Sequence, residues 1–166
     1  TREGGIGAAT LRFVGFGAVF LDFDSDGLLD VAFANGHMLD NPAQFRAGAS
    51  HAQRKLLFRN MGSRRFGDVT GRAGAGFAIA KVGRGLVAGD IDNDGDGRLD
   101  LVVTNLDFEM FCLFRGMGDR LFTYATPESG IGAATLPFVG FGAVFLDFHS
   151  DGVLDVAFAN GHMLDN

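Results

Sequence analysis

An all-β fold made of four-stranded antiparallel units, the blades of a β-propeller, is predicted by three observations. The 166-residue chain has 26 glycines, 18 phenylalanines, no tryptophan and only three prolines, a composition that favours short strands and tight turns over long helices. Short apolar runs alternate with turn residues along its length. The pattern recurs in units of about 60 residues, a length that suits a four-stranded blade. A stacked solenoid is the alternative with a similar period.

The repeat is clearest at the two ends of the chain. Residues 1–41 recur as residues 126–166, and the copies differ only at the pairs Arg2/Pro127, Gly4/Ser129, Arg12/Pro137, Asp24/His149 and Leu28/Val153. Two weaker matches lie between them, 83–106 with 15–36 and 112–126 with 56–70. We therefore predict a first blade at residues 1–70 with an inserted loop at 37–53, a second blade at 71–126, and a partial third blade at 127–166.

Each complete unit divides into four expected strands. Glycine, asparagine and aspartate separate the apolar runs and act as turn formers. In the first unit the runs are 15–23, 28–36, 54–61 and 65–70, and in the second they are 85–91, 98–106, 111–117 and 121–126. Several runs are apolar on both faces, which predicts strands covered from above and below. Phe16, Phe20, Phe23, Phe33 and their counterparts are expected to form the core between blades.

Charge and composition exclude several classes of function. The formal net charge of −6 argues against a nucleic acid as the main partner, because that binding depends on Lys and Arg displacing counterions. No apolar run approaches the roughly 20 residues that a membrane helix needs. The single cysteine, Cys112, excludes an internal disulfide framework and is expected to be buried as packing.

An aspartate cluster is the strongest chemical signal in the sequence. Residues 22–30 read D-x-D-x-D-G-x-x-D, which brings several negative charges together beside apolar strands. Alternate residues of a tight loop can turn their carboxylates inward, and Ca²⁺ accepts six to eight oxygen ligands in a tolerant geometry. We therefore predict a Ca²⁺ site at the turn between the first two strands. Its expected ligands are Asp22, Asp24, Asp26, Asp30 and the backbone carbonyl of Leu28.

The second acidic loop, DIDNDGDGRLD, is two residues longer and has two possible registers. Asp92, Asp94, Asp96 and Asp100 match the nine-residue spacing without gaps, whereas strand alignment with the first loop begins at Asp90. We favour the first set, with Asp90 adjacent as a possible participant. The third loop offers Asp147, His149, Asp151 and Asp155. An imidazole is a poorer ligand than a carboxylate for a hard cation, so we expect this site to be weaker or empty.

Two other structures share features with these loops. An EF-hand needs a twelve-residue loop that ends in Glu between helices, whereas here the ninth position is already Asp and the flanks resemble strands. Plain aspartate-rich turns are the simpler alternative, because Asp-Gly is a common turn pair. The recurrence of the loop at matching places in three units favours Ca²⁺ over this alternative.

These residues resemble a known group of repeats. GFGAVFLDFDSDGLLD is similar to the calcium-binding propeller repeats of the FG-GAP or VCBS type. The FRN-x-G turn and the F-x-D-V-T strand bring the chain closest to the repeats that precede the ASPIC/UnbV domain in secreted proteins of the cartilage-acidic-protein type. The resemblance implies a propeller with bound Ca²⁺, an extracellular or cell-surface location, and a role in adhesion or binding.

The function expected from these features is a calcium-stabilised module for structural assembly, adhesion or protein binding, without catalysis. Fewer than three blades cannot close a propeller, which needs about four to eight. We therefore expect the partners to be other copies of the chain or the rest of a longer repeat chain, for instance by residues 127–166 completing a neighbour's blade. An extracellular protein or a glycan is a further expected partner.

The alternatives are a hydrolase or lyase on a propeller scaffold and a carbohydrate-binding module. For an enzyme the candidate groups are His37, His51 and His162 with nearby basic residues, but no spacing indicates a catalytic triad. For glycan binding, Phe45 is the candidate. The basic residues Arg54, Lys55, Arg59, Arg64 and Arg65 are expected to be solvated charges.

Overall fold

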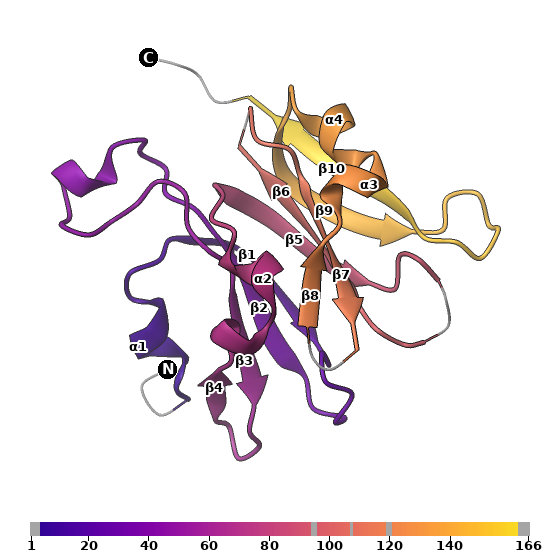
Figure 1. Cartoon of the computed structure of the whole chain (residues 1–166), viewed down its shortest axis with the longest axis horizontal. Coiled ribbons are helices and arrows are strands. Elements are labelled where there is room, and N and C mark those ends of the chain that lie inside the picture. The colour runs from indigo at the N-terminus through magenta and orange to yellow at the C-terminus, as the bar shows by residue number, and fades with distance from the viewer. Residues whose placement is uncertain (1–3, 94–95, 107, 119–120, 163–166) are drawn as a thin grey trace.

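The predicted all-β class is confirmed by the computed structural model of the chain, which describes residues 4–93, 96–106, 108–118 and 121–162 (Figure 1). The first sheet is antiparallel and has the order β1-β2-β3-β4, with β1 (Gly15–Leu21), β2 (Asp30–Asn35), β3 (Leu56–Asn60) and β4 (Phe66–Asp68). All four strands lie within the ranges expected from the sequence. The predicted ends were too long by up to two residues, because turn residues flank the apolar runs.

The second sheet repeats this topology in the order β5-β6-β7-β8. Its strands are β5 (Gly83–Gly89), β6 (Asp100–Asn105), β7 (Cys112–Met117) and β8 (Leu121–Tyr124). A third sheet pairs β9 (Val139–Leu146) with β10 (Asp155–Gly161). The number of blades in a closed propeller and the three domain ranges stay predictions.

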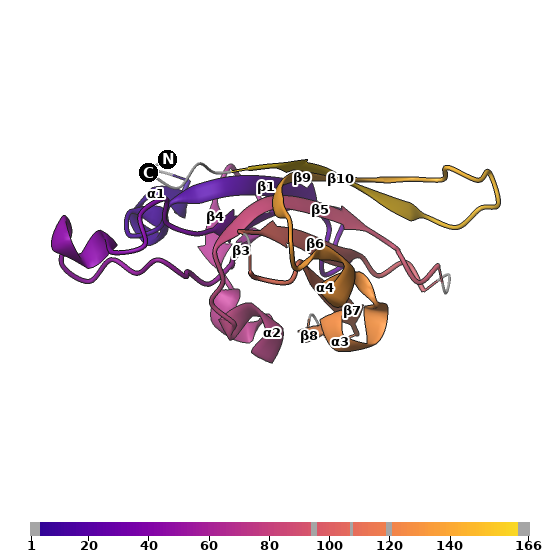
Figure 2. The ribbon, with the colours of Figure 1, turned by 90° about the horizontal axis from the view of Figure 1, so that it is seen from above.

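Short helical turns precede the first sheet, lie within its inserted loop, and connect consecutive sheets. They are α1 (Ile6–Thr10), η1 (Pro42–Gln44), η2 (Thr70–Arg72), α2 (Ala75–Ala78), α3 (Thr126–Ser129) and α4 (Ile131–Thr135). Figure 2 shows α2 and α3 on the side of the molecule opposite to β10. No helix within the described residues is long and apolar enough to cross a membrane.

The first strands of the three units pack side by side, with β5 between β1 and β9. Glycine allows this close approach. A Cβ added at Gly17 would lie 2.6 Å from the backbone oxygen of Arg84, and one added at Gly85 would lie 2.8 Å from the Cα of Gly142. The GFG and GRG segments therefore set the distance between consecutive units.

The main core lies between the first two sheets. It includes Phe77, Phe114 and Phe122, whose rings contact one another at centroid distances of 5.1 Å for Phe77–Phe122 and 6.1 Å for Phe77–Phe114. Cys112 is buried in the same cluster, as expected. Burial of these side chains is the main source of stability between the two units.

The expectation of an inter-blade core is wrong for two of the four named phenylalanines. Phe16 is 43% exposed and Phe20 is 65% exposed, whereas Phe23 and Phe33 are partly buried. Val19 packs into the core with the second unit, so Phe20, which points to the opposite face of β1, is turned away from it. Phe16 instead lies with its ring 4.1 Å from the Arg84 guanidinium.

The prediction of solvated basic residues is wrong for Lys55. Its side chain is buried, and its Nζ donates a hydrogen bond to the carbonyl of Ile79 at 2.9 Å and lies 4.4 Å from the ring centre of Phe114. Burial lowers the pKa of Lys55 to about 8. Arg54, Arg64 and Arg65 are exposed, as expected.

Candidate cation site

The first acidic loop is placed by the pairing of β1 with β2. Leu21 is opposite Asp30 in this ladder, so residues 22–29 must reverse the chain between them. The reversal uses two residues in left-handed conformation, Ser25 at φ 55° and Gly27 at φ 84°. Glycine adopts that conformation without steric cost, which explains the glycine of the motif.

Backbone N–H groups of the loop fold around its own carboxylates. Asp22 accepts hydrogen bonds from the N–H of Asp26 at 3.0 Å and from the N–H of Gly27 at 2.8 Å. Asp26 accepts one from the N–H of Leu28 at 2.9 Å. These bonds fix the orientation of two carboxylates and hold the loop in a compact turn.

Three of the four predicted aspartate ligands of this loop converge. One carboxylate oxygen from each of Asp22, Asp24 and Asp30 lies within 4.8 Å of the other two. Oxygens bound at about 2.4 Å to one ion lie at most about 4.8 Å apart, so this spacing suits a single Ca²⁺. The donor set, all hard carboxylate oxygens, also fits that ion. Leu28 as a carbonyl ligand stays a prediction.

Asp30 links the loop to two strands. Its carboxylate accepts the N–H of Phe23 at 3.2 Å and the N–H of Asn60 on β3 at 2.6 Å. Burial raises the pKa of Asp30 above its usual value, the two N–H groups act against this, and the negative charges of Asp24 and Asp26 add to the rise. The ionised carboxylate of Asp30 is therefore less favourable here than in water, and a bound cation would offset this electrostatic cost.

Arg59 on β3 was expected to be a solvated charge, and this expectation is wrong, because it pairs with two carboxylates of the loop. Its Nε lies 2.7 Å from Asp24 Oδ2 and its Nη2 lies 2.7 Å from Asp26 Oδ2. A hydrogen bond with Asp26 is the largest of the causes that raise the pKa of Arg59. The repeat itself contained the signal, because the FR pair of residues 58–59 recurs at residues 114–115.

Strand pairing aligns the start of the second loop with the first at Asp90, whereas the ligand set that we favour, Asp92, Asp94, Asp96 and Asp100, stays a prediction. Gly89 is opposite Asp100 in the ladder, and the N–H of Ile91 donates to Asp100 at 3.2 Å, as Phe23 does to Asp30. Asp90 therefore occupies the position of Asp22, and Asp92 that of Asp24. The N–H of Arg98 donates to Asp96, as Leu28 does to Asp26. Asp94 lies outside the described residues, and metal binding by this loop stays a prediction.

Two aspartates of the second loop also form ion pairs with arginines. Arg115 Nε on β7 lies 3.3 Å from Asp92 Oδ2, and Arg98 Nε lies 2.7 Å from Asp96 Oδ2. Asp100 accepts the N–H of Gly116 at 2.8 Å, and burial is the largest cause of its raised pKa. Among the residues that the structure describes, only the first loop brings three carboxylate oxygens within 4.8 Å of one another.

The third loop has the backbone geometry of the first. Asp147 accepts the N–H groups of Asp151 at 3.0 Å and Gly152 at 2.9 Å. His149, in the position of Asp24, lies with its Nδ1 3.1 Å from Asp155 Oδ2. The imidazole thus contacts the last aspartate of its own loop. A weaker or empty third site stays a prediction.

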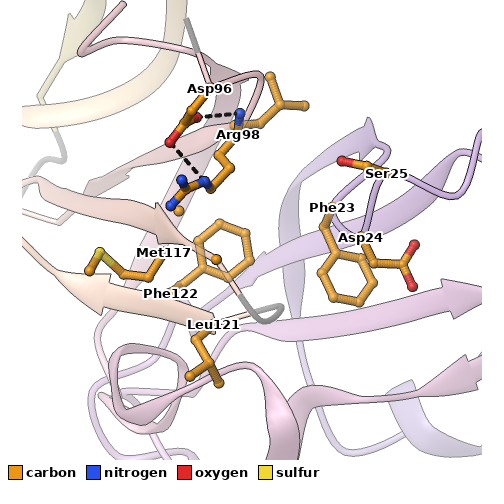
Figure 3. Close-up of a pocket in the computed structure, with 11 residues that line it drawn as sticks. Phe23, Asp24, Ser25, Asp96, Arg98, Met117, Leu121 and Phe122 are labelled. Carbon is orange, nitrogen blue, oxygen red and sulfur yellow. Dashed lines mark hydrogen bonds and ion pairs between the residues drawn. The ribbon is translucent and has the colours of Figure 1, made fainter. Parts of the chain in front are cut away.

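A cleft of about 380 Å³ lies beside the first loop, between the first two units. Figure 3 shows the rings of Phe23 and Phe122 on facing walls, with Arg98 and Asp96 paired at the rim. The Asp24 carboxylate points away from Phe122 in this view. Asp24 therefore belongs both to the carboxylate cluster and to the lining of the cleft.

The candidate histidines of an enzyme do not converge on this cluster or cleft. His37 and His51 belong to the inserted loop, where His37 Nδ1 accepts the N–H of Leu39 and His51 Nδ1 donates to the carbonyl of Leu39. His162 is exposed after β10. Phe45, the candidate for glycan contact, is 75% exposed on the inserted loop.

Comparison with known proteins gives a family match to part of the chain. The model of the FG-GAP-like repeat matches residues 94–158, a segment that runs from the second acidic loop through the third. The resemblance to FG-GAP repeats is thereby confirmed for this segment, while the resemblance to VCBS and ASPIC/UnbV repeats stays a prediction. A search of curated proteins gives no match to the chain.

Proposed function

We propose that the chain is a calcium-stabilised module of an extracellular protein, with a role in structural assembly, adhesion or protein binding and without catalysis. The observation that carries this proposal is the convergence of Asp22, Asp24 and Asp30 on one centre. The FG-GAP-like repeat supports it, because the same acidic turn recurs in the matched segment.

The physical role of the ion follows from the strand topology. Each acidic loop closes the turn between the first two strands of a unit, and its last aspartate begins the second strand. Several carboxylates in so small a space repel one another. A divalent cation offsets this repulsion and stabilises the folded chain by mass action, because the unfolded chain does not present the site.

The proposed partners are further copies of the same repeat unit, in this chain or in a longer one, or another extracellular protein or glycan. The exposed phenylalanines on β1 and the exposed side chains of β9 support contact with a further unit, because β5, which lies between two such neighbours, has no exposed residue. Contacts of this kind are the normal way in which propeller blades cover their sheets.

Calcium titration of the whole chain tests the proposal. We expect isothermal calorimetry to show Ca²⁺ binding, and we expect the melting temperature to fall when the ion is removed with a chelator. The matched control is Asp40→Asn, an exposed aspartate outside the acidic loops, which should bind Ca²⁺ like the wild-type chain. A melting curve that is the same in millimolar Ca²⁺ and in chelator would contradict the proposal.

A further inference from the structure

Arg59 bridges two carboxylates of the first loop from the neighbouring strand. Its Nε and Nη2 each lie 2.7 Å from an oxygen, one of Asp24 and one of Asp26. The Asp24 side chain is fully buried, at 0% exposure, and the Arg59 side chain is 28% exposed. A planar guanidinium makes such charge-assisted bonds with fixed geometry, which a flexible ammonium group cannot reproduce.

The contact acts on the orientation of Asp24. That carboxylate also supplies one of the three oxygens that lie within 4.8 Å of one another. In metal sites, a residue that does not itself bind the ion can donate a hydrogen bond to a ligand side chain. This bond fixes the orientation of the ligand and tunes the affinity of the site for the ion. Arg59 makes this kind of contact, since its guanidinium reaches Asp24 from β3 and not from the loop itself.

The second unit provides an independent instance. Arg115 occupies the same place on β7 as Arg59 on β3, and it pairs with Asp92, the residue in the position of Asp24, at 3.3 Å. In the third loop the carboxylate is replaced by His149, which pairs with Asp155 instead. The arginine therefore accompanies an aspartate at this position in both units that the structure describes with a third strand.

We propose that Arg59 is a positioning residue for the cation site of the first loop, and that its guanidinium holds Asp24 and Asp26 in the orientation that cation binding requires. Arg115 has the same role for the second loop. This inference rests on the proposed function, because it assigns the residue to the same calcium site.

A charge-conserving substitution separates positioning from simple electrostatics. In Arg59→Lys the positive charge stays but the fixed two-carboxylate contact is lost, and we expect Ca²⁺ affinity at this site to fall by about 10-fold or more. In Arg59→Met both are lost, and affinity should fall as well. If Arg59 acted only through its charge, Arg59→Lys would bind like the wild-type chain and Arg59→Met would bind more tightly. That result would overturn the inference.

Controls assign the effect to the first loop. Arg46→Lys, on the exposed inserted loop, should leave calorimetric Ca²⁺ affinity unchanged. Asp22→Asn removes a ligand of the first site, so Arg59→Lys should cause no further loss on that background. Melting in chelator reports folding, and a residue with a structural role alone would lower the melting temperature there without changing the affinity of the folded chain.

The two proposals fail in different ways. If the wild-type chain binds no Ca²⁺, the proposed function and this inference are both overturned. If the wild-type chain binds Ca²⁺ and Arg59→Lys binds it with equal affinity, the inference alone is overturned.

Discussion

Asp30, at the start of β2, accepts the backbone N–H of Asn60, at the end of β3, at 2.6 Å. The same carboxylate accepts the N–H of Phe23, which follows β1. Asp100 repeats this arrangement in the second unit with Gly116 and Ile91. The last aspartate of the acidic motif thus joins three strands of its unit in addition to its proposed role as a ligand.

Asp30→Ala should destabilise the chain even in chelator. The substitution leaves two backbone N–H groups without their acceptor, and each such loss at a buried position costs about 1–3 kcal/mol. Chemical denaturation in chelator should show a fall of about 3 kcal/mol in the free energy of unfolding. The control Asp40→Ala, at an exposed site, should change little. If the two variants unfold alike, the carboxylate of Asp30 has no structural role.

Gly17→Ala should disturb the packing of β1 on β5. The added methyl group would meet the backbone oxygen of Arg84 at 2.6 Å, and backbone atoms cannot move aside as a side chain can. We expect a loss of about 1–3 kcal/mol, as in other overpacked sites. Gly71→Ala is the matched control, since a Cβ there would meet no atom within 4 Å. Equal melting temperatures for the two variants would argue against close β1–β5 packing.

Phe77→Ala should cost about 3–5 kcal/mol in the free energy of unfolding, because it removes a large side chain from the core between the first two sheets. Phe77 is 1% exposed and contacts both Phe114 and Phe122. Phe45→Ala, which removes the same side chain from a position that is 75% exposed, serves as the control and should be nearly neutral. Equal losses of unfolding free energy in the two variants would show that Phe77 is not part of the core.

Stability should increase with pH above 8 because of Lys55. Its pKa is about 8 in the folded chain and 10.5 as the ordinary value. Below pH 8, Lys55 is protonated in both the folded and the unfolded chain. Between pH 8 and 10.5 the unfolded chain binds more protons than the folded chain, so the free energy of unfolding rises with pH. The total rise is about 3 kcal/mol.

Denaturant unfolding at a series of pH values from 7.5 to about 10 tests this dependence on pH. Lys55→Met should remove most of the rise, whereas Arg54→Met, at the exposed neighbouring position, should keep it. A rise of the same size in Lys55→Met would assign it to another group.

The sequence alone determined the strands, their order within each unit and the acidic turns. These features depend on local patterns, namely apolar runs, turn residues and the spacing of aspartates. The repeat strengthened these predictions, because the same pattern recurs at matching places in several units. The family match over residues 94–158 agrees with this part of the prediction.

Only the tertiary structure decided which charged side chains form ion pairs. Arg59 is 33 residues from Asp26 in the chain, and its pairing depends on how β3 lies beside β2 and its preceding loop. The burial of Lys55 and the exposure of Phe20 also depend on which unit faces each strand. The alignment of the second loop with the first was decided by the pairing of Gly89 with Asp100, because strand register depends on the hydrophobic pattern of the paired strands and on turn geometry, not on the spacing of aspartates.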